Sequence, residues 1–109
     1  LRTATKELIT AADKSLSIGD KHDEGYERHY IEAFKSYTEA LAMSEQITED
    51  RPDIKTVSLN RDKAKEALLK AKDELTAKAK DFEASDMPDI AKEFYNRVKN
   101  ITEALKYNP

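Results

Sequence analysis

The chain has 109 residues, of which 39% are hydrophobic and 38% charged, and its formal net charge is −3. This length suits one domain with one continuous core, and the balance of apolar and charged residues is typical of amphipathic helices with solvated outer faces. An acidic chain lacks the basic excess of a nucleic-acid-binding protein, and no apolar run approaches the roughly 20 residues of a membrane helix. We therefore expect neither a nucleic-acid partner nor a transmembrane segment.

The first predicted helix covers about residues 3–17. Its apolar stripe is formed by Leu8, Ala12 and Leu16 and is widened by Ala4, Ile9 and Ala11. We expect this helix to stop near Gly19, because glycine tolerates the left-handed conformation that often ends helices.

The second predicted helix covers about residues 27–47 and follows a polar insert at residues 21–29. Its stripe consists of Tyr30, Phe34, Tyr37, Leu41 and Ser44, with Ala33, Ala40 and Ile47 beside it. The small alanines let a neighbouring helix approach closely. The stripe places Tyr30 and Tyr37 in the core, with hydroxyls that we expect to reach water.

The third predicted helix is the longest, at about residues 53–83. Asp50, Pro52 and Asp53 form its expected start, and a break near Ser58 or Asn60 is one possibility that the sequence leaves open. Its stripe consists of Ile54, Val57, Ala64, Leu68, Ala71, Leu75, Ala79 and Phe82.

The fourth predicted helix covers about residues 87–106, with Ser85 or Asp86 as its expected cap. Its stripe consists of Met87, Ala91, Phe94, Val98, Ile101 and Leu105. The short connection before it predicts an antiparallel packing on the third helix. Since no segment alternates as a strand would, we predict one all-α domain over residues 1–109, an antiparallel bundle of four helices.

The sequence carries little that would serve catalysis. It has no cysteine, and His22 and His29 lack the further ligands that a metal site needs. No nucleophile with a matching base and no phosphate loop is present, so we expect no enzyme, no metal and no cofactor. Absence of cysteine and of a signal peptide fits a cytoplasmic location, although a secreted or surface protein is also compatible. Because the chain opens on Leu1, we expect a fragment of a larger protein.

Four residues are candidates for contact with a partner. Tyr26 and Tyr95 lie off the main stripes and are the tyrosines best placed on the surface. Lys65 and Lys72 lie in a basic run, residues 61–72, that could hold an acidic peptide or phospholipid headgroups. The simpler interpretation of this run is a solvated helix face with Lys and Glu as helical neighbours.

The segment from Gly19 to Leu41 resembles the helix-turn-helix of tetratricopeptide repeats and, equally, the first two helices of microtubule-interacting and trafficking (MIT) domains. Ala33, Tyr37 and Ala40 match the small–aromatic–small pattern of the second helix in these families. The insert at residues 21–29 departs from that pattern, and the chain has no second copy of a repeat. Residues 51–55 resemble the turn in the MIT-like N-terminal dimerisation domains of endosomal deubiquitinases.

The resemblance implies an interaction domain whose second and third helices form a groove for a partner's short helix. It also implies an acidic residue on the third helix, where this chain has Lys72. We therefore expect a non-enzymatic module that binds a partner helix or peptide, and the resemblance implies a role in endosomal trafficking. The alternatives are a homodimerisation domain of a larger enzyme and a structural helical segment of a bacterial or archaeal cell-envelope protein.

Overall fold

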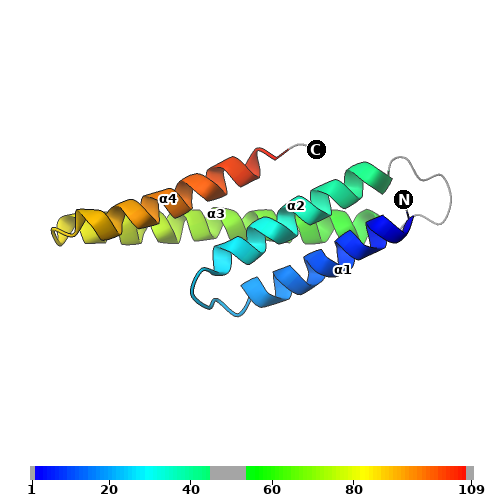
Figure 1. The fold of residues 1–109 in the computed structure, drawn as a ribbon, viewed down its shortest axis with the longest axis horizontal. Helices are drawn as coiled ribbons and strands as arrows, with labels where there is room; N and C mark the ends of the chain where they lie inside the picture. Colours follow the sequence, from blue (N-terminus) through cyan, green and yellow to red (C-terminus); the bar gives the residue numbers. More distant parts are fainter. Residues whose placement is uncertain (1, 45–53, 108–109) are drawn as a thin grey trace.

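A computed structural model describes residues 2–44 and 54–107 of the chain, and these form four α-helices. They are α1 (Arg2–Gly19), α2 (Tyr26–Ser44), α3 (Ile54–Ala84) and α4 (Pro88–Leu105). Consecutive helices run antiparallel and pack against one another (Figure 1). The predicted all-α antiparallel bundle is thus confirmed.

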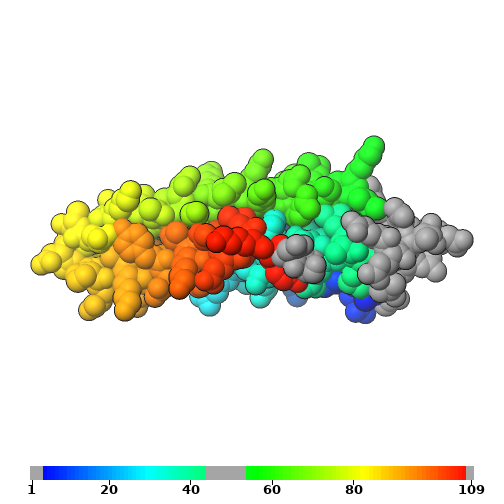
Figure 2. All heavy atoms as spheres, turned by 90° about the horizontal axis from the view of Figure 1, so that it is seen from above, coloured from blue at the N-terminus to red at the C-terminus, as the bar shows by residue number. Residues whose placement is uncertain are grey.

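The long helix α3 is the axis of the molecule. The α1–α2 hairpin lies along one end of α3, and α4 folds back along the other (Figure 1). Only α2 of the hairpin also touches α4, and α1 packs mainly on α2. The stagger gives an elongated body of 58 × 25 × 18 Å, in which α4 reaches from one end of α3 to the middle (Figure 2).

The buried side chains follow the predicted stripes of α2 and α3 closely. The core combines these two stripes with Ala12 of α1 and Ile101 of α4, and its other buried members are Tyr30, Ala33, Phe34, Tyr37, Ala40, Val57, Ala64, Leu68, Ala71 and Leu75. On α4, Ala91 and Ala104 are also buried. The fourth helix is therefore part of the fold, as its stripe predicted.

The stripes of α1 and α4 are narrower than predicted. Ala4 and Ala11 are exposed, whereas Thr5 is fully buried. This follows from the packing of α1, which has one principal neighbour and hence one covered face. Met87, predicted as the first core residue of the fourth helix, is 46% exposed because it lies at the end of the molecule.

Gly19 ends α1 for a different reason from the one predicted. It keeps a helical backbone, and the left-handed residues of the connection are His22, with φ 56°, and Gly25, with φ 73°. A Cβ on Gly19 would lie 2.9 Å from two ring carbons of Tyr30. Glycine is needed here because the aromatic ring of α2 packs directly against the α1 backbone.

The turn between α3 and α4 also differs from the prediction. Asp86 has a left-handed backbone (φ 60°), and the Met87 N–H donates to the Phe82 carbonyl at 2.8 Å. This is the pattern of a Schellman helix end, with Asp86 where glycine is usual. The N-cap of α4 is Met87, which makes no side-chain cap hydrogen bond, so neither Ser85 nor Asp86 caps it.

Two further predictions concern α3. It runs without interruption through Ser58 and Asn60, so no break occurs there. The expected helix start at Asp50, Pro52 and Asp53 lies outside the described residues.

Adjacent leucines on α3 provide a test of the core. Leu68 is fully buried where α3 meets its neighbours, whereas Leu69 is 44% exposed. We expect Leu68→Ala to lower the free energy of unfolding by about 2–5 kcal/mol, since it removes buried methyl groups and leaves a cavity. Leu69→Ala, the matched control, should change it by less than about 0.5 kcal/mol. Chemical denaturation measures both, and similar losses in the two variants would show that the face of α3 is assigned wrongly.

Candidate functional site

The first turn of α2 is tied to both α3 and α4, and we call this place the junction. The Tyr26 hydroxyl donates to Oε2 of Glu74 on α3 at 2.7 Å. The Arg97 guanidinium of α4 donates twice to Glu27, from Nε to Oε2 at 2.7 Å and from Nη2 to Oε1 at 2.6 Å. Neighbouring residues of α2 thus fix the positions of two other helices.

Glu27 is a buried charge, with only 2% of its surface exposed. Burial alone would raise the pKa of its carboxyl, but the hydrogen bonds from Arg97 and from the backbone hold the pKa below its ordinary value. The same contact raises the pKa of Arg97. The pair is therefore fully ionised at neutral pH.

Sequence reasoning missed this pair, although a signal for it exists. Glu27 lies one turn before Tyr30 on the stripe of α2, and Arg97 lies between Phe94 and Ile101 on that of α4. Opposite charges inside two apolar stripes favour a pair between the two helices, because either charge alone would be costly to bury.

Aromatic rings surround the junction. The rings of His22 and Tyr26 have centroids 4.6 Å apart, and Tyr30 meets Tyr26 edge-on at 5.9 Å. On the α4 side, the Arg97 guanidinium lies 5.2 Å from the ring centroid of Phe94, which in turn stacks on Phe82 at 5.4 Å. The rings thus form two groups, one at the start of α2 and one between α3 and α4, and the Glu27–Arg97 pair lies between them.

All five tyrosines donate their hydroxyls to a carboxylate on another part of the chain. The pairs are Tyr26–Glu74, Tyr30–Asp20, Tyr37–Asp13, Tyr95–Glu83 and Tyr107–Glu39. Tyr30 and Tyr37 are core residues, as predicted, and their hydroxyls, which we expected to reach water, donate to acids of the α1 side. These bonds join α1 to α2, α2 to α3, α3 to α4 and α4 to α2.

Two small hollows flank Tyr26. One, of about 200 Å³, lies between the aromatic rings and α3, against Lys70, Ala71 and Glu74. The other, of about 150 Å³, lies between the α1–α2 connection and the α3–α4 pair, against Lys78, Phe94 and Arg97.

The structure does not gather the four predicted contact residues into one site. Tyr26 is half-buried at the junction, while Tyr95 is 37% exposed and bound to Glu83 near the far end of α3. Lys65 lies by Tyr107, at the other end of α4. Lys72 is half-buried and two residues from Glu74, hence on roughly the opposite side of α3 from Tyr26.

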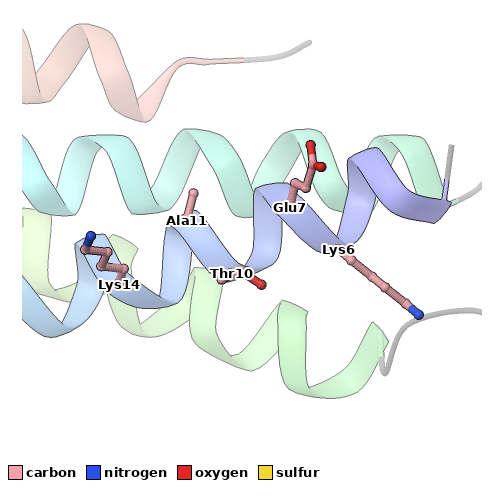
Figure 3. A pocket seen from close by; sticks show the side chains of 5 residues that line it. All are labelled: Lys6, Glu7, Thr10, Ala11 and Lys14. Carbon is pink, nitrogen blue, oxygen red and sulfur yellow. The ribbon is translucent and has the colours of Figure 1, made fainter.

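A larger hollow on α1 gives no convergent site. It is lined by Lys6, Glu7, Thr10, Ala11 and Lys14 and has a volume of about 400 Å³. Figure 3 shows that the two lysine side chains point away from each other and that Glu7 lies on another side of the helix. Such a divergent set cannot hold a small ligand from several directions.

Comparisons with protein-family models, with curated proteins and with solved structures found no match. Within the described residues, no helix is both long and apolar enough to span a bilayer. In the same part of the chain, no three potential metal-ligating side chains lie together.

A double-mutant cycle tests the role of the ion pair. We expect Arg97→Met to lower the free energy of unfolding by about 3 kcal/mol, because it leaves the Glu27 carboxylate buried without its partner. Adding Glu27→Leu should recover a large part of this loss, since the buried charge is then gone as well. Denaturant titrations of the four proteins measure the coupling, and additive effects would contradict the assignment.

The tyrosine contacts predict instability in alkali. Burial first, and then the hydrogen-bonded carboxylates, raise the pKa values of Tyr26, Tyr30 and Tyr37 above the ordinary 10. Above pH 10 the unfolded chain releases these protons while the folded chain keeps them. These tyrosines should therefore add no pH dependence to the free energy of unfolding below pH 10. Above pH 10 the free energy of unfolding should fall as the pH rises.

Thermal melts between pH 8 and pH 11.5, together with phenolate absorbance, measure this dependence. A Tyr30→Phe variant should show a shallower fall than the parent, which separates tyrosine ionisation from that of the lysines. Full phenolate formation near pH 10 with native helicity retained would contradict the prediction.

Proposed function

We propose that this domain is a non-enzymatic protein–protein interaction module that takes a partner helix or peptide along a furrow between its helices. The observation that carries the proposal is the uncovered end of the α3–α4 pair. Both helices run on past the hairpin, and no other described helix accompanies them there (Figure 1).

We call residues 79–93 the tip. Ala79 and Ala91 are buried where its two helices meet, and they lie outside the main core. Beside them, Met87 is 46% and Ile90 is 38% exposed, and Phe82 is half-buried. The tip is therefore a small two-helix unit with apolar side chains that the rest of the described chain leaves uncovered.

The spacing of these side chains suits a helical partner. Met87, Ile90 and Phe94 follow one another at i, i+3 and i+7, so they lie along one side of α4. A row of this kind beside a second helix forms the surface on which an amphipathic helix docks by its apolar face. Exposed apolar side chains that gather, rather than scatter, are typical of contact surfaces.

A role in endosomal trafficking is supported by the resemblance of the segment from Gly19 to Leu41, and of residues 51–55, to MIT-like domains. The absence of cysteine fits a cytoplasmic location for this role. Homodimerisation is the competing function, because the same uncovered apolar row could pack against a second copy.

Selection from a displayed random-peptide library tests the proposed function. We expect the folded domain to enrich peptides with apolar residues at helical spacing, and the enriched peptides to lose binding to Ile90→Asp. Leu69→Asp is the matched control: it also places a charge at an exposed apolar position of the bundle, but away from the tip. No enrichment over an unrelated helical protein, or equal loss in both variants, would contradict the proposal.

A further inference from the structure

We infer that the tip and the adjoining hollow at the junction bind a basic amphipathic helix, laid end to end with α2 along the furrow between α3 and α4. This inference rests on the proposed function and adds the place and the chemistry of the partner.

The first argument is continuity with an interface that already exists. The start of α2 packs between α3 and α4, where Tyr26 meets Glu74 and Glu27 meets Arg97. The hollow beside Tyr26 lies next to this contact, with the α1–α2 connection on one side and Lys78 and Phe94 of the α3–α4 pair on the other. A helix that followed the line of α2 would therefore find the same pair of supporting helices that α2 uses.

The second argument is the length and character of the free furrow. Residues 75–84 of α3 extend beyond the level of Glu74, which corresponds to about 15 Å of helix, enough for about three turns of a partner. Apolar side chains occur along this length from both helices, with Phe82 on α3 and Ile90 and Phe94 on α4. A partner with apolar residues at i, i+3 or i+4, and i+7 would match them.

The third argument is charge. Exposed carboxylates outnumber cations in this part of the molecule: Asp23 and Glu24 line the hollow, and the tip carries Asp81, Asp86 and Glu93. The cations nearest to them are Lys78, which lines the hollow, Arg28, which lies beside Gly25 of the connection, and Arg97, which is already paired with Glu27. Helical spacing places Lys80 and Lys92 about 160° away from the furrow, two residues from Phe82 and Ile90 respectively.

This charge distribution distinguishes between possible occupants. A second copy of the tip would bring the same carboxylates opposite one another, which is unfavourable. A helix with lysines or arginines flanking its apolar stripe would instead place opposite charges along both rims. The acidic border therefore favours a basic partner over self-association.

Two synthetic peptides of about 14 residues test the inference. They share one apolar stripe and differ only in their flanking residues, which are Lys and Arg in one and Glu in the other. We expect the basic peptide to bind about tenfold or more tightly than the acidic one, as two or three rim ion pairs would give, and to weaken with added salt. Fluorescence anisotropy of labelled peptides measures both affinities.

Variants of the domain locate the site. Ile90→Asp and Met87→Asp should each abolish binding of the basic peptide, and both positions are exposed, so the melts of these variants verify that the fold is kept. The double change Asp81→Lys with Glu93→Lys should reduce or reverse the preference for the basic peptide. Leu69→Asp, away from the tip, should bind like the parent.

Several results would overturn the inference. They are equal or tighter binding of the acidic peptide, absence of binding by either peptide, and binding that Ile90→Asp leaves intact. A concentration-dependent dimer that Ile90→Asp abolishes would assign the tip to a second copy instead. None of these results contradicts the proposed function if library selection still yields peptides whose binding depends on the tip. The two proposals can therefore be tested independently.

Discussion

A helix of 31 residues cannot be covered along its whole length by neighbours of 18 or 19 residues. In this chain the α1–α2 hairpin packs on one end of α3 and α4 packs on the other end. The hairpin and α4 overlap only near the middle of α3, where α2, α3 and α4 meet. The large buried side chains Leu68, Leu75 and Ile101 lie there. The elongated shape and the uncovered tip both follow from this difference in length.

The ion pair between Glu27 and Arg97 fixes how far the α1–α2 hairpin and α4 overlap along α3. Apolar stripes of alanine and leucine tolerate a shift by one heptad, because the side chains at either register are alike. A buried carboxylate does not tolerate it, since the shift would leave Glu27 without its guanidinium at a cost of several kcal/mol. The end of α4 adds the contact of Tyr107 with Glu39 and the approach of the Lys35 ammonium to the Tyr107 ring. Polar contacts thus select one register for a largely interchangeable apolar core.

The sequence was sufficient for the elements and for most of the core, because 3.6-residue periodicity is a local property that each helix carries by itself. The stripe from Val57 to Ala79 is an example, and all of its predicted members between these two residues are buried. What the sequence could not supply is the stagger, which depends on pairings between distant residues such as Glu27 and Arg97. For the same reason Gly19 was understood as a helix stop, whereas its true constraint is the ring of Tyr30 on another helix. The predicted contact residues failed to converge because spacing within one helix says nothing of where a neighbouring helix ends.

The tip shows most clearly which apolar residues the fold requires. Ala79 and Ala91 are buried between α3 and α4 and hold these two helices together at this end. Met87 and Ile90 are exposed, so polar residues in their places would cost the isolated domain little. The resemblance to MIT domains would place a ligand between the second and third helices, but here α4 contacts both of them. Beyond the start of α2, the α3–α4 pair is instead held by its two alanines and by the stacked rings of Phe82 and Phe94, and the exposed Met87 and Ile90 are the apolar side chains that this packing does not use.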